Sequence, residues 1–168
     1  MLLSIIWFFT DYNRLEPLTI LFGGVASLAN FIYPKPNYGN KRVKGRDSFD
    51  YSSNSGLFHI GKEDFLFTTM WTKASDVSIY LYKDPENISK IAIAEGAFNF
   101  KDIRNPDVFD FSSRSRTIEE GQIAVLVNKN GYYCLIKIID IKDKTRADDR
   151  DEITIEWVIN PYKEKDFS

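Results

Sequence analysis

Two arginines at alternate positions form the first candidate site, one for an anion. Arg114 and Arg116 lie in the segment SSRSRT, directly after Ser112 and Ser113. In an extended segment both guanidinium groups project to the same side, and guanidinium groups suit phosphate and carboxylate. The segment therefore predicts a site for an anionic small molecule such as a nucleotide.

An acidic segment later in the chain offers the same arginines a partner within the protein. Residues 143–152 read DKTRADDRDE and carry four closely spaced carboxylates, those of Asp148, Asp149, Asp151 and Glu152. Ion pairs between Arg114, Arg116 and this segment are the structural alternative to ligand binding, because such pairs form readily at surfaces. The sequence leaves both interpretations open.

These four carboxylates also raise the question of a metal site. Mg²⁺ and Ca²⁺ prefer oxygen ligands, so a metal-dependent hydrolase of nucleotides or nucleic acid is one hypothesis. The spacing matches no calcium-binding loop, and Arg146 and Arg150 lie among the acids. A solvated hairpin tip is the favoured interpretation, and no metal or cofactor is expected.

A third candidate lies in the segment MWTKAS, where Trp71 and Lys73 provide an aromatic ring and a cation. Such a pair can receive a ligand, although core packing is the usual role of a tryptophan. His59 has no second catalytic group beside it, and Cys134 lies in an apolar segment. The sequence has no glycine-rich phosphate loop, G-x-S-x-G elbow or H-E-x-x-H helix. A binding protein is therefore favoured over an enzyme.

Charge is distributed unevenly along the 168 residues. Residues 1–33 carry a net charge of −1 and residues 34–46 carry +5, so the total of −2 leaves −6 for residues 47–168. An acidic domain is a poor general binder of nucleic acid, and such binding is not expected. The length allows one core of ordinary size with an appendage.

The appendage is the apolar N-terminal segment, residues 1–33. Its second apolar run, Leu18 to Tyr33, has sixteen residues and would reach about 24 Å as a helix, short of a hydrocarbon core of roughly 30 Å. The candidate membrane-contact or helix-packing residues are Gly23, Gly24, Ser27 and Trp7. Small residues at such spacing let helices approach closely.

The basic residues that follow bear on which side of a membrane the rest would lie. If the apolar run inserts, the five cations of residues 34–46 keep the following domain cytoplasmic by the positive-inside rule. The alternative is a soluble, cytoplasmic protein whose N-terminal helices bind a protein partner or drive self-association into a homo-oligomer.

From Phe49 onward the sequence predicts strands. The segment from Gly121 to Asn160 indicates a three-stranded antiparallel meander with its first turn at Asn130 and Gly131. Short β-like runs precede it, whereas residues 97–120 suggest an ordered loop with at most one short element. The predicted fold is mainly β: a small barrel or sandwich of about seven or eight mostly antiparallel strands, preceded by one or two short N-terminal helices.

The expected organisation has four parts: an apolar helical segment (1–33), a basic linker (34–48), a β-domain (49–162) and a tail (163–168).

Several segments of the β-domain carry a family resemblance. The segments FDYSSNSGLFHIG, FTTMWTKASDVSIYLYKDP, FDFSSRSRT, GQIAVLVNKNGYYCLIKI and DDRDEITIEWVI resemble a widespread, poorly characterised bacterial β-rich domain over about residues 49–160. Domains of this kind occur alone or attached to other modules, including Toll/interleukin-receptor-like ones. The resemblance implies a role in bacterial sensing or defence and carries over no catalytic residue.

The expected function is therefore a non-enzymatic ligand-binding or sensing β-domain tethered to the cytoplasmic face of a membrane, as a bacterial defence or signalling effector. The soluble interaction module and the metal-dependent hydrolase are the alternatives.

Overall fold

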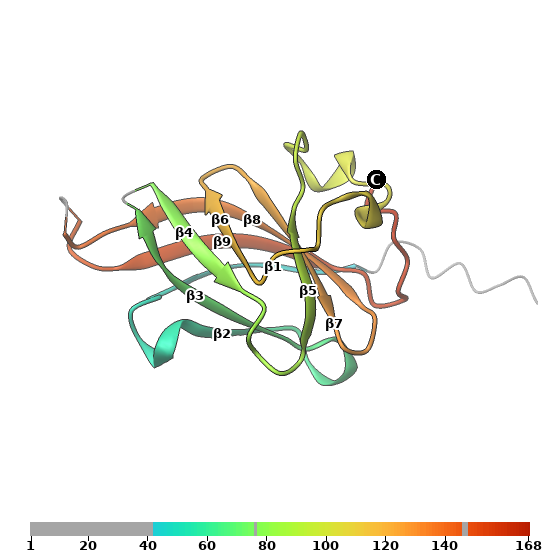
Figure 1. The fold of residues 1–168 in the computed structure, drawn as a ribbon, viewed down its shortest axis with the longest axis horizontal. Coiled ribbons are helices and arrows are strands. Elements are labelled where there is room, and N and C mark those ends of the chain that lie inside the picture. Colours follow the sequence, from blue (N-terminus) through green and yellow to red (C-terminus); the bar gives the residue numbers. More distant parts are fainter. Residues whose placement is uncertain (1–41, 76, 146–147) are drawn as a thin grey trace, which may run out of the picture. The chain divides into compact units, whose positions relative to one another are not determined.

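The computed structural model describes residues 42–75, 77–145 and 148–168, which hold nine strands in two antiparallel sheets (Figure 1). The larger sheet has the order β1 (Val43–Phe49), β9 (Glu152–Ile159), β8 (Tyr133–Lys142), β7 (Ile123–Asn128) and β5 (Ile88–Ile93). The smaller sheet has the order β2 (Leu57–Ile60), β3 (Phe67–Ser75), β4 (Ser78–Tyr82) and β6 (Ser115–Glu119). Four short 3-10 turns complete the described elements: η1 (Asn54–Gly56), η2 (Glu63–Phe65), η3 (Phe100–Asp102) and η4 (Pro106–Val108).

The predicted meander is confirmed and forms the middle of the larger sheet. Strand β7 pairs with β8, and β8 pairs with β9, all antiparallel. The first turn closes with a hydrogen bond from Gly131 N to Asn128 O of 3.0 Å. Gly131 has a φ of +80°, whereas Asn130 is not among the residues with positive φ. The connection is therefore a turn followed by one left-handed glycine, and not a turn with two left-handed residues.

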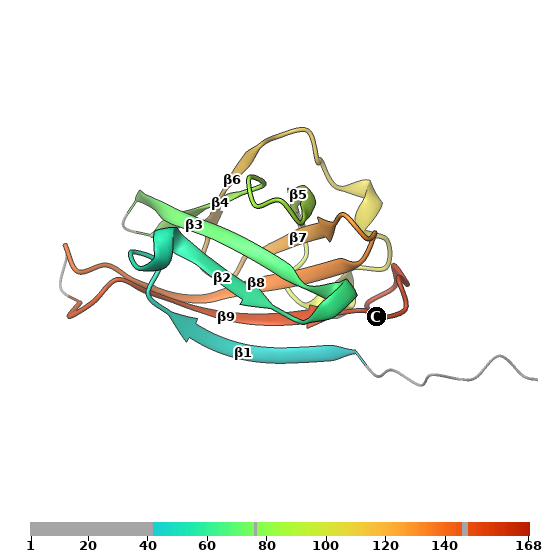
Figure 2. The same cartoon turned by 90° about the horizontal axis from the view of Figure 1, so that it is seen from below.

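The main core lies between the two sheets. Its largest side chains include Trp71 and Phe67 from the smaller sheet, both fully buried, and they belong to one cluster with Ile136 and Ile155 from the larger sheet. Figure 2 shows β2 and β3 as one layer and β8, β9 and β1 as another. The two sheets remain separate in the described residues, so the fold is a sandwich and not a closed barrel.

A second apolar cluster covers part of the outer face of the larger sheet. Ile103, which follows η3, and Phe167, near the C-terminus, pack there against Val125 and Val158. Figure 1 shows the C-terminus beside the segment that holds η3 and η4. This cover explains why Val158 breaks the alternation of β9: its outward-facing side chain is also buried, at 5% exposure.

Three parts of the described structure differ from the expected organisation. Residues 43–48, assigned to a basic linker, form most of β1, because Val43, Gly45 and Phe49 turn inward while the cations alternate outward. Residues 97–120 hold two 3-10 turns and β6 in place of at most one short element. The tail contains Phe167, which is fully buried. The expected N-terminal helices lie outside the described residues.

Candidate functional site

The two candidate arginines are both bound to carboxylates, and each has its own. Arg114 donates two hydrogen bonds to Asp84, from Nε to Oδ1 at 2.7 Å and from Nη2 to Oδ2 at 2.6 Å. Arg116 Nη2 donates to Asp110 Oδ2 at 2.8 Å and also to the Asp110 carbonyl oxygen. These guanidinium groups hold the pKa of Asp84 and of Asp110 below the usual value.

The strand register explains this choice of partners. Lys83 N donates to Arg114 O at 2.9 Å, which brings the turn that carries Asp84 beside Arg114. Arg116 lies in β6 opposite Leu81, and its side chain is only 18% exposed. Ser112 N donates to Asp110 Oδ1 at 2.9 Å, and Ser113 is half-buried. An anion would have to displace Asp84 and Asp110 to bind both arginines together.

The acidic segment is bound within its own hairpin. Asp148 accepts a hydrogen bond from Asp143 N at 2.8 Å, Asp151 accepts one from Lys144 N at 3.0 Å, and Glu152 pairs with Lys142 at 2.8 Å. Within residues 42–75, 77–145 and 148–168, no group of three or more His, Cys, Asp or Glu side chains is placed to hold a metal ion.

Lys73 joins this hairpin to the smaller sheet. Its Nζ lies 2.5 Å from Asp143 Oδ2 and 2.7 Å from Thr145 Oγ1. The Asp143 side chain is 1% exposed, and the adjacent Lys73 ammonium group is the main reason that its pKa falls to about 2. Trp71 is fully buried and donates from Nε1 to Thr69 Oγ1 at 2.7 Å. Trp71 and Lys73 therefore serve packing and pairing, and they do not meet at one surface site.

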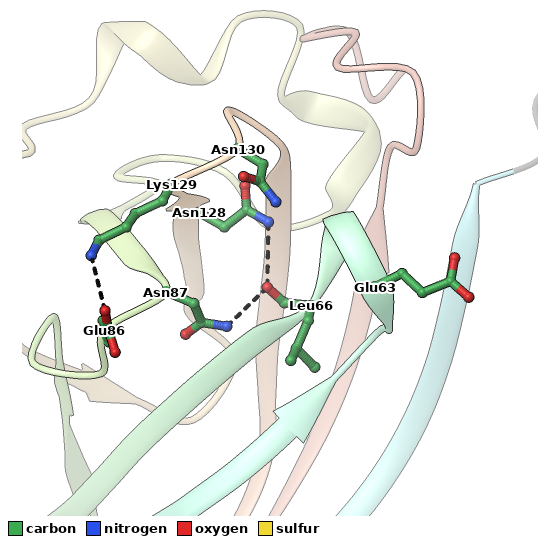
Figure 3. A pocket seen from close by; sticks show the side chains of 7 residues that line it. All are labelled: Glu63, Leu66, Glu86, Asn87, Asn128, Lys129 and Asn130. Carbon is green, nitrogen blue, oxygen red and sulfur yellow. Dashed lines mark hydrogen bonds and ion pairs between the residues drawn. The ribbon is translucent and has the colours of Figure 1, made fainter.

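A pocket of about 300 Å³ lies where three loops meet (Figure 3). Its polar lining includes the amides of Asn87, Asn128 and Asn130 and three charged residues. Asn87 and Asn128 donate to Leu66 O at 3.1 and 3.3 Å, and Asn130 donates to Asp64 O at 2.9 Å. These bonds tie the loops together. Figure 3 shows Glu63 directed away from the amides and Lys129 directed to Glu86, 3.9 Å away.

A second pocket, of about 330 Å³, lies around Gly96 and Gly121. Glu95, Glu120 and the highly exposed Phe98 line it. Glu120 is engaged, because it accepts a hydrogen bond from Ile141 N at 2.8 Å.

The outer face of the smaller sheet differs in charge from the outer face of the larger sheet. Alternate residues of β2, β3, β4 and β6 face away from the core, as their register and exposure show. We call the following nine side chains the neutral face: Leu57, His59, Thr68, Met70, Thr72, Tyr80, Tyr82, Ser115 and Thr117. All nine are half-buried or exposed, and none is Asp, Glu, Lys or Arg. The first charged residue in this register is Glu119, at the rim.

Some polar side chains of the neutral face contact one another. His59 Nδ1 and Thr68 Oγ1 lie 3.0 Å apart, and Thr72 Oγ1 donates to the Tyr82 hydroxyl at 3.2 Å. The rings of Tyr80 and Tyr82 have centroids 6.0 Å apart. The tyrosine and methionine side chains of the neutral face and its lack of Asp, Glu and Lys agree with the composition of binding-interface cores, where tyrosine and methionine are enriched and these charged residues are depleted.

The outer face of the larger sheet provides the contrast. Where the second apolar cluster ends, charged pairs begin: Arg46 with Glu156 at 3.2 Å and Lys142 with Glu152 at 2.8 Å. That face therefore combines covered apolar side chains with charged pairs, as is ordinary for a sheet that meets solvent.

The neutral face was missed at the level of sequence, although part of its signal is there. Thr68, Met70 and Thr72 alternate with Phe67, Thr69 and Trp71 without a single charge. What the alternation does not reveal is which other strands lie beside β3 in the sheet.

Cys134 is fully buried, and burial raises the pKa of its thiol.

The remaining sequence candidates, Gly23, Gly24, Ser27 and Trp7, lie outside the described residues. Among the residues that are described, no helix is long and apolar enough to cross a bilayer. Comparison of the chain with protein-family models, with curated proteins and with solved structures finds no match.

Proposed function

We propose that this protein is a non-enzymatic binding module and that the neutral face is its binding surface. The observation that carries the proposal is the nine-residue outer face of the smaller sheet, which is accessible and contains no Asp, Glu, Lys or Arg. Interfaces between proteins are depleted of charge at their centre and enriched in tyrosine and methionine.

The rest of the described surface supports this choice. The candidate arginines and the acidic hairpin already have partners inside the protein. The amides of the 300 Å³ pocket hold its loops together. The neutral face has tyrosine and methionine side chains with exposed apolar atoms, and removing these atoms from water lowers the free energy and so favours binding.

Oxidative footprinting in living cells tests the proposal without knowledge of the partner. Met70 is the only methionine besides Met1, so its oxidation is a specific signal, and Tyr80 and Tyr82 add two more. We expect these three residues to be labelled several-fold less in cells than in the dilute purified protein. Phe98, which is 74% exposed, is the internal control and should be labelled equally in both. Equal labelling of Met70, Tyr80 and Tyr82 in both settings would refute the binding face.

The membrane tether is a separate part of the proposal and depends on residues 1–33. The support for it is sequence alone: the apolar run and the five cations of residues 34–46. Fractionation of the full chain and of a chain without residues 1–33 tests it, since the tether predicts that only the full chain sediments with membranes. If the full chain stays in the soluble fraction, the tether is wrong and the binding face is unaffected.

A further inference from the structure

We propose that the occupant of the neutral face is a second copy of this chain, so that two smaller sheets pack face to face in an isologous dimer. This inference rests on the proposed function, because it names the partner of the same surface.

The first argument is charge. In an isologous dimer the same patch meets itself, so every charged side chain near the two-fold axis faces its own equivalent. Residues 42–168 carry a net charge of −3, and the outer face of the larger sheet presents Arg46, Glu156 and Lys142. The neutral face contains no carboxylate, ammonium or guanidinium group, so two copies can meet there without the repulsion that such groups would cause.

The second argument is hydrogen bonding. A carboxylate only accepts and an ammonium group only donates, so neither can pair with a copy of itself. A hydroxyl group both donates and accepts. Six residues of the neutral face carry a hydroxyl group: Thr68, Thr72, Tyr80, Tyr82, Ser115 and Thr117. The other polar side chain is the imidazole of His59, which in its neutral form also donates and accepts. The face is therefore complementary to itself in hydrogen bonding as well as in charge.

The third argument is the size and shape of the face, and its small size limits the affinity of the dimer. Three strand spacings of about 4.8 Å and five residues at about 3.4 Å give a footprint of roughly 14 by 17 Å. Sheets pack face to face at such surfaces with their strands inclined by about 30°. The footprint is smaller than that of a standard interface of about 800 Å² per partner, so a weak, concentration-dependent dimer is expected.

Sedimentation equilibrium of the full chain over about a hundredfold range of concentration tests the inference. The variants Thr72→Lys and Thr117→Lys place a cation in the neutral face, and Thr117 is exposed on the edge strand β6, where folding tolerates the change. We expect each to weaken self-association at least tenfold, because two like charges are then desolvated together. The matched control is Ser89→Lys, at an exposed hydroxyl of β5 outside the face, and it should associate like the wild type.

A mixing experiment distinguishes loss of the interface from misfolding, because misfolded variants would not recover association when mixed. Thr72→Lys and Thr72→Glu chains should each stay dissociated, and their equimolar mixture should recover association, because opposite charges then meet across the interface. Association that is absent, or that survives Thr72→Lys and Thr117→Lys unchanged, overturns the second copy as occupant. If Met70, Tyr80 and Tyr82 are still protected in cells, the binding face itself stands with another partner. If they are not, both proposals fail.

Discussion

At the scale of single residues, the Lys73 to Asp143 pair is the clearest link between electrostatics and stability. The folded-state pKa of Asp143 is about 2, against an ordinary 3.8, so the folded protein holds this proton less tightly than the unfolded chain. The stabilising contribution is therefore complete above about pH 4 and is lost as the pH falls towards 2.

Replacement of Lys73 tests this dependence. Lys73→Met leaves the carboxylate of Asp143 buried without its cation, so we expect a lower free energy of unfolding at neutral pH and a smaller deficit near pH 3. Urea unfolding at several pH values measures both. Lys129→Met is the control, because Lys129 lies 3.9 Å from a fully exposed Glu86 and should change little at any pH. A deficit that is constant with pH would contradict the assignment.

Alanine substitutions at two glycines with similar φ values distinguish the cost of backbone strain from the cost of a steric clash. Gly56 and Gly131 have φ of +71° and +80°, but a Cβ on Gly56 would lie 1.9 Å from Trp71 O, whereas one on Gly131 would meet nothing within 4 Å. We expect Gly131→Ala to cost about 1 to 2 kcal/mol from the left-handed conformation alone. Gly56→Ala should cost more than about 4 kcal/mol, because backbone must move. Chemical denaturation of the two variants gives the comparison, and equal costs would show that the contact with Trp71 relaxes freely.

At the scale of elements, the C-terminal segment acts as part of the fold. Phe167 is fully buried in the second apolar cluster, and its backbone N donates to Ile103 O at 2.9 Å. Arg42 Nη1 donates to Phe167 O at 2.6 Å, which joins the start of β1 to the end of the chain. Part of the outer face of the larger sheet is thus covered by segments far apart in sequence.

A matched pair of substitutions measures how much the buried Phe167 side chain contributes to the stability of the protein. Phe167→Ala should destabilise the protein by about 3 to 5 kcal/mol, because it leaves a cavity against Val125 and Val158. Phe98→Ala removes the same atoms from a side chain that is 74% exposed and should change stability by less than about 0.5 kcal/mol. Thermal unfolding of both variants is the measurement, and a small effect of Phe167→Ala would mean that the second cluster adds little to stability.

At the scale of the whole described domain, the two sheets present different surfaces to their surroundings. One outer face combines a covered apolar cluster with charged pairs, and the other is accessible and contains no Asp, Glu, Lys or Arg. A dimer through the neutral face would bring together two molecules that each carry net negative charge. Salt should therefore strengthen the association modestly by screening that long-range repulsion. Sedimentation at low and high ionic strength tests this, and weakening by salt would indicate ion pairs at the interface instead.

The strongest patterns in the sequence predicted strands correctly, and the failures have physical causes. Strands β7, β8 and β9 were identified because their side chains are apolar with a period of two and a glycine turn joins the first pair. Strand β1 was assigned to a linker because its outward positions carry Lys44 and Arg46, which obscured the inward Val43 and Phe49. Strand β6 was missed because Arg116, at an inward position, breaks its short apolar pattern.

For the candidate sites, the sequence identified residues that are charged but not their partners. Arg114 and Arg116 were singled out, but Asp84 and Asp110 were not, because strand pairing and turns decide which carboxylate lies within reach. Asp143 lies within the acidic segment, yet only the structure shows that Lys73 reaches it across the sheets.

The sequence by itself determined that the described domain is mainly β, because alternation of apolar and polar side chains is local and follows from the geometry of a strand. Tertiary structure alone decided which strands are neighbours and which faces are covered. The neutral face exists only because β2, β3, β4 and β6 pair in that order, so that uncharged residues from four separate segments lie side by side. Pairing between distant segments depends on the packing of the whole core, and no local pattern encodes it.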